Sequence, residues 1–145
     1  MIIKSVLTPF LFGLVGIFAF APFSIEFLIF VSYIYLINEL TSHKKASFLR
    51  ILFWGIGHWG FGMSWIIVSV YYYGETTIAL SAFIYFLLIM ILALVFTSPL
   101  ILINKLLLNI EINNTFIKIF IISTLLLISE TSRYFLLNGV PWLIP

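Results

Sequence analysis

Long apolar runs separated by short polar or charged stretches are the dominant pattern along this chain. A bilayer core about 30 Å thick needs roughly 20 apolar residues per helix, so we divided the chain where charges and turn residues cluster. This predicts an all-α integral membrane protein, a bundle of about five transmembrane helices in a single domain, residues 1–145. The predicted spans are 5–20, 25–40, 49–71, 78–103 and 116–137.

The predicted spans differ in how purely apolar they are. The third and fourth contain no Asp, Glu, Lys or Arg except Arg50, which lies at one edge. The first two are short and are joined by residues 21–24 (Ala-Pro-Phe-Ser), which predicts a tight turn and a compressed hairpin. The fifth is apolar until Glu130 and Arg133 interrupt it near its end.

Composition excludes a water-soluble fold. The chain is 63% hydrophobic and 8% charged, whereas soluble domains are about 45–50% apolar and 25% charged. Seven Lys/Arg and five Asp/Glu cannot cover the surface of a domain of 145 residues, so lipid is the expected solvent. The net charge of only +2 forms no basic face, which argues against a nucleic-acid partner.

The chain contains no cysteine, so it offers no disulfide framework, no thiolate metal site and no Cys nucleophile. We expect no metal and no cofactor. His58 lies inside the third predicted span, and the only other histidine, His43, lies in a loop. Two such residues supply almost no metal ligands, so we interpret His58 as a structural residue.

Lys and Arg positions predict the orientation, because positively charged short loops stay in the cytoplasm. Only Arg133 falls on the opposite side of the five-span arrangement. The N-terminus is therefore predicted to be cytoplasmic, with a retained first helix rather than a cleaved signal peptide. The positions that share the cytoplasmic side are Lys4, Lys44, Lys45, Arg50, Lys105 and Lys118.

Residues 55–60 match the G-x-G-x-x-G spacing of dinucleotide-binding proteins, but that fingerprint requires a preceding strand and a βαβ unit. Inside a membrane helix, glycines instead allow close helix packing, with Gly60 and Ser64 as a small-xxx-small pair. Further along the same span, Ser64 and Trp65 bring polar groups below the aromatic residues 71–73. These positions indicate either an aromatic belt or a groove for a lipid headgroup or acyl chain.

The end of the chain combines charge with turn-forming residues. Glu130 and Arg133 are spaced i, i+3, which predicts a structural ion pair on one helix face. Gly139, Pro141 and Trp142 follow on the predicted outer side. They either cap a substrate site or anchor the helix at the interface.

Several fragments together resemble the N-terminal membrane region of the apolipoprotein N-acyltransferases, bacterial enzymes that add the third acyl chain to lipoproteins. The fragments span most of the chain, and their order and spacing are more specific than any one of them. They are residues 18–23 (Phe-Ala-Phe-Ala-Pro-Phe), residues 60–65 (Gly-Phe-Gly-Met-Ser-Trp) with Val68, Ser69 and Gly74, and Glu130 and Arg133 with residues 139–142 (Gly-Val-Pro-Trp).

The resemblance implies a multi-pass protein of the bacterial inner membrane. It also implies a phospholipid acyl donor, a diacylated lipoprotein acceptor, and a nitrilase-like domain that carries a Glu, Lys and Cys triad. Such a domain would lie beyond Pro145 or be encoded separately, so we assign no catalytic residue here and expect the chain alone to be inactive. The substrate-binding residues suggested are Ser64, Trp65, Gly139, Pro141 and Trp142.

Two other functions remain open at this level. A small transporter or channel subunit would carry polar residues along several helices or a repeat, and the middle spans show neither. A structural membrane scaffold would need no outward cluster of aromatic and polar residues.

Overall fold

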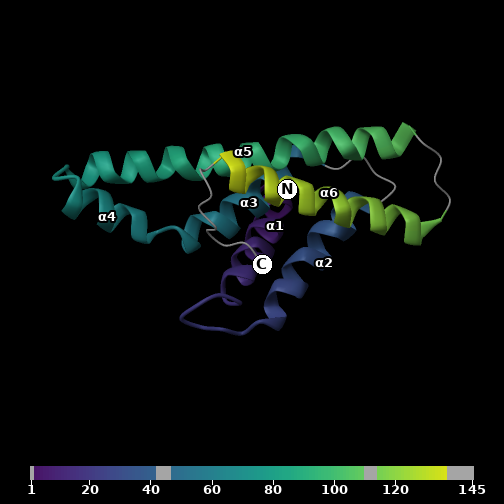
Figure 1. The fold of residues 1–145 in the computed structure, drawn as a ribbon, viewed down its shortest axis with the longest axis horizontal. Coiled ribbons are helices and arrows are strands. Elements are labelled where there is room, and N and C mark those ends of the chain that lie inside the picture. The colour runs from purple at the N-terminus through teal and green to yellow at the C-terminus, as the bar shows by residue number, and fades with distance from the viewer. Residues whose placement is uncertain (1, 42–46, 110–113, 137–145) are drawn as a thin grey trace.

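The computed structural model describes residues 2–41, 47–109 and 114–136, and these residues form six α-helices and no strand. The all-helical prediction is confirmed for this part of the chain. Figure 1 shows α5 running along the whole length of the molecule, while α1 and α2 project to one side of it. The helices are α1 (Ile2–Ile17), α2 (Phe27–Thr41), α3 (Phe48–Gly62), α4 (Trp65–Tyr73), α5 (Ile78–Asn109) and α6 (Thr115–Leu136).

The third predicted span is not one helix. It is divided at Met63 and Ser64 into α3 and α4, whose axes differ by 53°. The N–H of Ser64 bonds the carbonyl of Phe61 at 3.1 Å, an i to i−3 bond that tightens the last turn of α3. Hydropathy could not reveal this bend, because the residues on both sides of it are apolar.

The connection between the first two helices is also longer than predicted. It runs from residue 18 to residue 26, where a turn at 21–24 was expected. The N–H of Ile25 bonds the carbonyl of Phe18 at 2.9 Å and closes this loop. The peptide bond between Ala21 and Pro22 is cis.

Length and hydropathy single out one membrane-crossing helix among the described residues. The segment Ile78–Leu102 of α5 is long and apolar enough to cross a bilayer, and the bent α3–α4 pair qualifies if it counts as one span. The α1 and α2 helices are apolar but have 16 and 15 residues, or about 24 Å of helix each. Five transmembrane crossings therefore stay a prediction.

The α1 and α3 helices cross with their backbones in contact. A Cβ atom added to Gly13 would lie 2.0 Å from the carbonyl oxygen of Trp54, and one added to Gly57 would lie 2.2 Å from that of Phe10. Only glycine permits this distance at either position, which is the small-residue packing typical of membrane helices. Gly60 behaves differently, because a Cβ there would meet nothing within 4 Å. The close packing predicted for Gly60 with Ser64 is therefore wrong.

Aromatic rings fill the space beside this crossing. Trp54 and Trp59 of α3 are fully buried, and Phe96 of α5 is 1% exposed. The Trp54 ring stacks on Phe96 with centroids 5.5 Å apart, and Trp59 contacts the same ring edge-on at 5.0 Å. These contacts hold α3 against α5.

Polar contacts tie the helices together at one end of the molecule. Arg50 of α3 contacts the Glu39 carboxylate of α2 at 2.8 Å and donates to the Tyr35 hydroxyl at 2.8 Å. On α5, the buried Asn104 side chain donates to the carbonyl of Leu40 at 3.0 Å. Helix ends that carry polar groups are thereby joined across three helices.

The backbone contact between α1 and α3 predicts a large difference between two glycines of one helix. Gly57→Ala forces α1 away from α3 and is expected to destabilise the protein by about 1–3 kcal/mol. Gly60→Ala, the matched control, has free space and gains helix propensity of up to about 1 kcal/mol. Thermal unfolding in detergent compares the two, and a Gly57→Ala protein as stable as Gly60→Ala would contradict the crossing.

Candidate functional site

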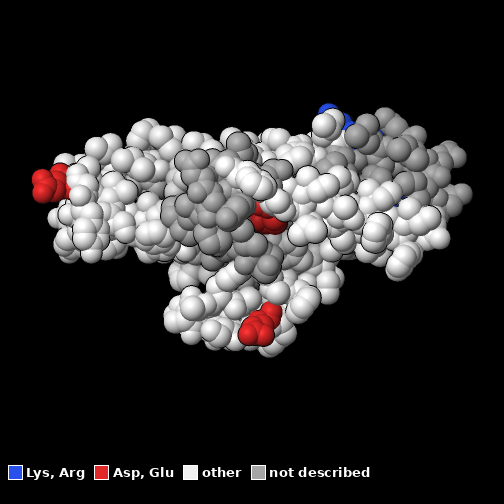
Figure 2. Space-filling view, in the orientation of Figure 1, with Lys and Arg blue, Asp and Glu red and all other residues white. Residues whose placement is uncertain are grey.

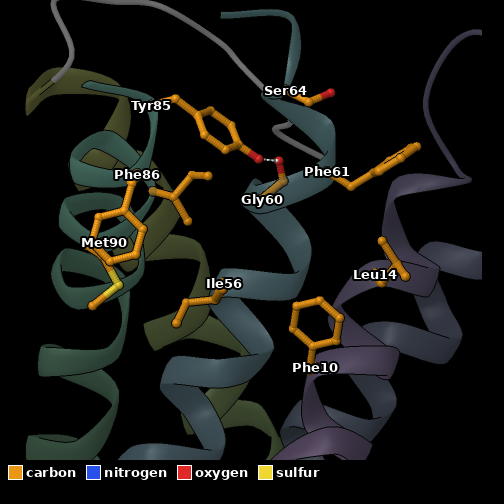
Figure 3. A pocket seen from close by; sticks show the side chains of 10 residues that line it. Phe10, Leu14, Ile56, Gly60, Phe61, Ser64, Tyr85, Phe86 and Met90 are labelled. Atoms are coloured by element: carbon orange, nitrogen blue, oxygen red, sulfur yellow. Dashed lines mark hydrogen bonds between the residues drawn. The ribbon is translucent and has the colours of Figure 1, made fainter. Parts of the chain in front are cut away.

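An apolar groove lies between α1, α3 and α5. Its volume is about 440 Å³. Figure 3 shows the side chains of α1 and α5 facing each other across α3, which forms the floor. The lining residues are Phe10, Leu14, Ile56, Gly60, Phe61, Ser64, Tyr85, Phe86, Ile89 and Met90.

The groove owes its width to Gly60 and to the bend that follows it. Because Gly60 has no side chain and no heavy atom lies within 4 Å of its missing Cβ, the floor stays open there. Ile56 lies one turn earlier on the same face of α3. A hydrocarbon chain is the kind of ligand that such a surface favours, since its walls offer apolar contact and few hydrogen bonds.

Ser64 and Tyr85, which carry hydroxyl groups, line the groove near the break of α3. In a continuous helix the Gly60 carbonyl would accept from the Ser64 N–H, but that N–H bonds Phe61 instead. The Tyr85 hydroxyl of α5 donates to the Gly60 carbonyl in its place (Figure 3). Ser64 is exposed beside it. The groove thus has a long apolar part and a short polar end, as an amphiphilic ligand requires.

Of the predicted substrate-binding residues, the structure describes Ser64 and Trp65, and only one of these two lines the groove. Ser64 lines the groove, while Trp65 begins α4, is 48% exposed and does not line it. Gly139, Pro141 and Trp142 lie outside the described residues. The groove residues of α1 and α5 were missed, because nothing in a uniformly apolar sequence distinguishes a residue facing a groove from one facing lipid.

The structure describes one of the two side chains of the predicted ion pair between Glu130 and Arg133. Glu130 is 5% exposed, and its carboxylate accepts a hydrogen bond from the Tyr33 hydroxyl at 3.0 Å. The side chain of Arg133 lies outside the described residues, so the ion pair stays a prediction. Sequence reasoning did not connect Glu130 with Tyr33, which is 97 positions away in the chain.

His58 is fully buried among rings and backbone. Its ring stacks on Trp54 with centroids 5.1 Å apart and an interplanar angle of 7°, and its Nδ1 lies 3.4 Å from the carbonyl oxygen of Gly13. Among the described residues no group of three or more His, Asp or Glu side chains could hold a metal ion. The surroundings of His58 are those of a packing residue.

These features define a small, strongly apolar helical domain with a lateral groove suited to a hydrocarbon chain. Residues 12–145 match the family model described as the apolipoprotein N-acyltransferase N-terminal domain. Because this match covers most of the chain, the protein belongs to that family, as the resemblance in the sequence implied.

Three similar proteins are named apolipoprotein N-acyltransferase. The chain is 39% identical over 83 residues to the apolipoprotein N-acyltransferase of Haemophilus influenzae, which covers 57% of this chain and 16% of that protein. It is 29% identical over 143 residues to that of Haemophilus ducreyi, covering 98% of this chain and 27% of the relative. It is 26% identical over 132 residues to that of Pasteurella multocida, covering 90% and 24%.

The chain therefore spans about a quarter or less of the length of these relatives. No solved structure matches it.

The bond from Tyr85 to Gly60 predicts that the broken end of α3 depends on one hydroxyl group. Tyr85→Phe leaves the Gly60 carbonyl without this donor in an apolar environment, and we expect a loss of about 1 kcal/mol of stability. Tyr72→Phe is the matched control, because Tyr72 is 69% exposed at the end of α4. Thermal unfolding of both variants measures the difference, and equal midpoints would refute this role for Tyr85.

Proposed function

We propose that this chain is the membrane-embedded N-terminal part of an apolipoprotein N-acyltransferase, which transfers an acyl chain from a phospholipid to the N-terminal amine of diacylated lipoproteins. Family membership supports the enzyme class. The observation that carries the proposal is the groove between α1, α3 and α5. An enzyme that takes an acyl chain from lipid needs an apolar surface open to the bilayer, and the groove supplies one.

In this proposal the chain holds lipid and does not itself make or break bonds. An acyl group needs a nucleophile to carry it between donor and acceptor, and the sequence offers no cysteine. We infer that the bond-making steps belong to a nitrilase-like domain, in the same polypeptide or a separate one. Detectable lipoprotein acylation by the purified chain alone would contradict this division of labour.

The polar end of the groove then suits the ester end of a lipid. The hydroxyls of Ser64 and Tyr85 lie at this end, while Phe10, Leu14 and Met90 line the apolar part. A hydrocarbon tail placed along the apolar part would direct its ester group toward the break between α3 and α4. Orientation of one tail in this way reduces the number of poses in which the ester can react.

We further propose five crossings of the bacterial inner membrane, with a cytoplasmic N-terminus and the bent α3–α4 pair as one crossing. Figure 2 shows a face with few charges, in which basic atoms lie toward the end where α5 finishes. Acidic atoms lie at the opposite end, where α4 meets α5, near the middle of the face and near the start of α2. This separation of charge supports the orientation, because basic residues stay in the cytoplasm.

The orientation predicts opposite labelling at two exposed positions. Tyr73→Cys, at the 89% exposed end of α4, is expected to react with a membrane-impermeant maleimide added outside intact spheroplasts. Thr115→Cys, at the exposed start of α6, is expected to react only after the membrane is opened. The reverse pattern would overturn the orientation, and reaction of both from outside would overturn the number of crossings.

The groove predicts that filling its floor displaces lipid. Gly60→Leu places a side chain in the open space above Gly60, and we expect at least a several-fold loss of cross-linking to a phospholipid with a diazirine in its acyl chain. Gly60→Ala should retain most of the cross-linking, because one methyl group occupies little of about 440 Å³. The yield of cross-linked peptides from α1 and α5 is measured by mass spectrometry.

A control position on α6 separates groove binding from general contact with lipid. Cross-linking at Phe120, which is 65% exposed on α6, should be unchanged in Gly60→Leu. Equal labelling of the groove in Gly60→Leu and the unmodified protein would show that the groove does not hold the acyl chain.

A further inference from the structure

The hydrogen bond between Tyr33 and Glu130 joins two helices that are distant in sequence. The hydroxyl of Tyr33, on α2, donates to Oε1 of Glu130, on α6, at 3.0 Å. Glu130 is 5% exposed, and the neighbouring Ser129 is equally buried. Burial of a carboxyl group among apolar residues costs free energy unless the group has hydrogen-bond partners. The Tyr33 hydroxyl supplies such a partner to Glu130.

The α6 helix packs against α5 and α2. One face carries the buried residues Ile122 and Leu126, which lie two turns and one turn before Glu130. Other described side chains of α6 are exposed, among them Phe120, Leu127 and Phe135 at 65%, 68% and 73%. In a bilayer, lipid tails satisfy apolar side chains as well as another helix does. Apolar contact alone therefore sets neither the depth nor the rotation of α6 strongly.

The donor of this hydrogen bond is itself held firmly. The ring of Tyr33 packs edge-on against Trp54 with centroids 5.3 Å apart, and against His58 at 6.3 Å. Both partners lie on α3 and are fully buried. The groove-lining residues Ile56 and Gly60 each lie two positions after one of these partners, Ile56 after Trp54 and Gly60 after His58. Two positions correspond to about 200° around the helix, so the groove lies on the opposite face of α3. The same helix thus holds Tyr33 on one face and forms the groove floor on the other.

We propose that the hydrogen bond from Tyr33 to Glu130 is a register lock that sets the depth and rotation of α6 relative to α3. The inference rests on the proposed function, because it requires the helices to lie in a bilayer.

The test measures the placement of α6 directly. Spin labels at Phe61→Cys on α3 and Phe135→Cys on α6, both on exposed side chains, report the distance between the two helices by pulsed EPR in lipid nanodiscs. A second pair, Leu11→Cys and Phe61→Cys, reports the α1–α3 crossing. Each pair is measured in the otherwise unchanged chain and in variants of the lock.

Tyr33→Phe removes the donor and keeps the ring. We expect the 61–135 distance to broaden or shift by at least one helical residue, about 1.5 Å, while the 11–61 distance stays the same. Glu130→Gln retains an acceptor oxygen and should stay close to the unchanged chain. Thr131→Val is the matched control, because its hydroxyl bonds only within α6, to the carbonyl of Leu127 at 2.8 Å.

Three outcomes would overturn the lock. They are an unchanged 61–135 distance in Tyr33→Phe, an equal shift in Thr131→Val, or a simultaneous change of the 11–61 distance, which would mean that the bond holds the whole bundle and not α6 alone. These results are independent of the lipid cross-linking at Gly60. Loss of the groove proposal with an intact distance response leaves the lock standing, and the converse also holds.

Discussion

The structure depends on a backbone contact between α1 and α3 that only glycine allows. Gly13 and Gly57 bring each helix against a main-chain carbonyl of the other. Where apolar burial does not drive helices together, close van der Waals contact is the main source of association. The α1–α3 crossing is therefore the contact on which the other helix positions depend. The side chains around it determine where α2 and α5 pack.

Hydrogen bonds of polar side chains connect the helices that the glycine contact between α1 and α3 does not join. Arg50 joins α3 to α2, Asn104 joins α5 to α2, and Tyr33 joins α2 to α6. Each bond connects different helices, and a polar group without a partner in hydrocarbon costs several kcal/mol. Although this sequence has few polar side chains, each of these three selects a neighbouring helix, and apolar packing alone would not make that selection.

How much was predictable follows from this division. The helical class and the family could be predicted, since apolar runs and motifs such as residues 60–65 are local features of the chain. The break at Met63 and Ser64 could not, because the residues on both sides of it are apolar. The contact of Glu130 with Tyr33 also escaped prediction: i, i+3 spacing pointed to Arg133, and spacing rules describe only neighbours on one helix.

The groove is the least predictable feature, and it arises from a conflict between two requirements. A straight α3 would give the Gly60 carbonyl a partner within the helix and would continue as a single apolar rod. The bend removes that partner, and the sequence supplies Tyr85 from α5 as a substitute. If the bent α3–α4 pair is one crossing, as we propose, the break lies at membrane depth, where a broken helix is tolerated only if it lines a cavity or is buried in protein. Its presence beside a groove therefore argues that the groove belongs to the fold itself.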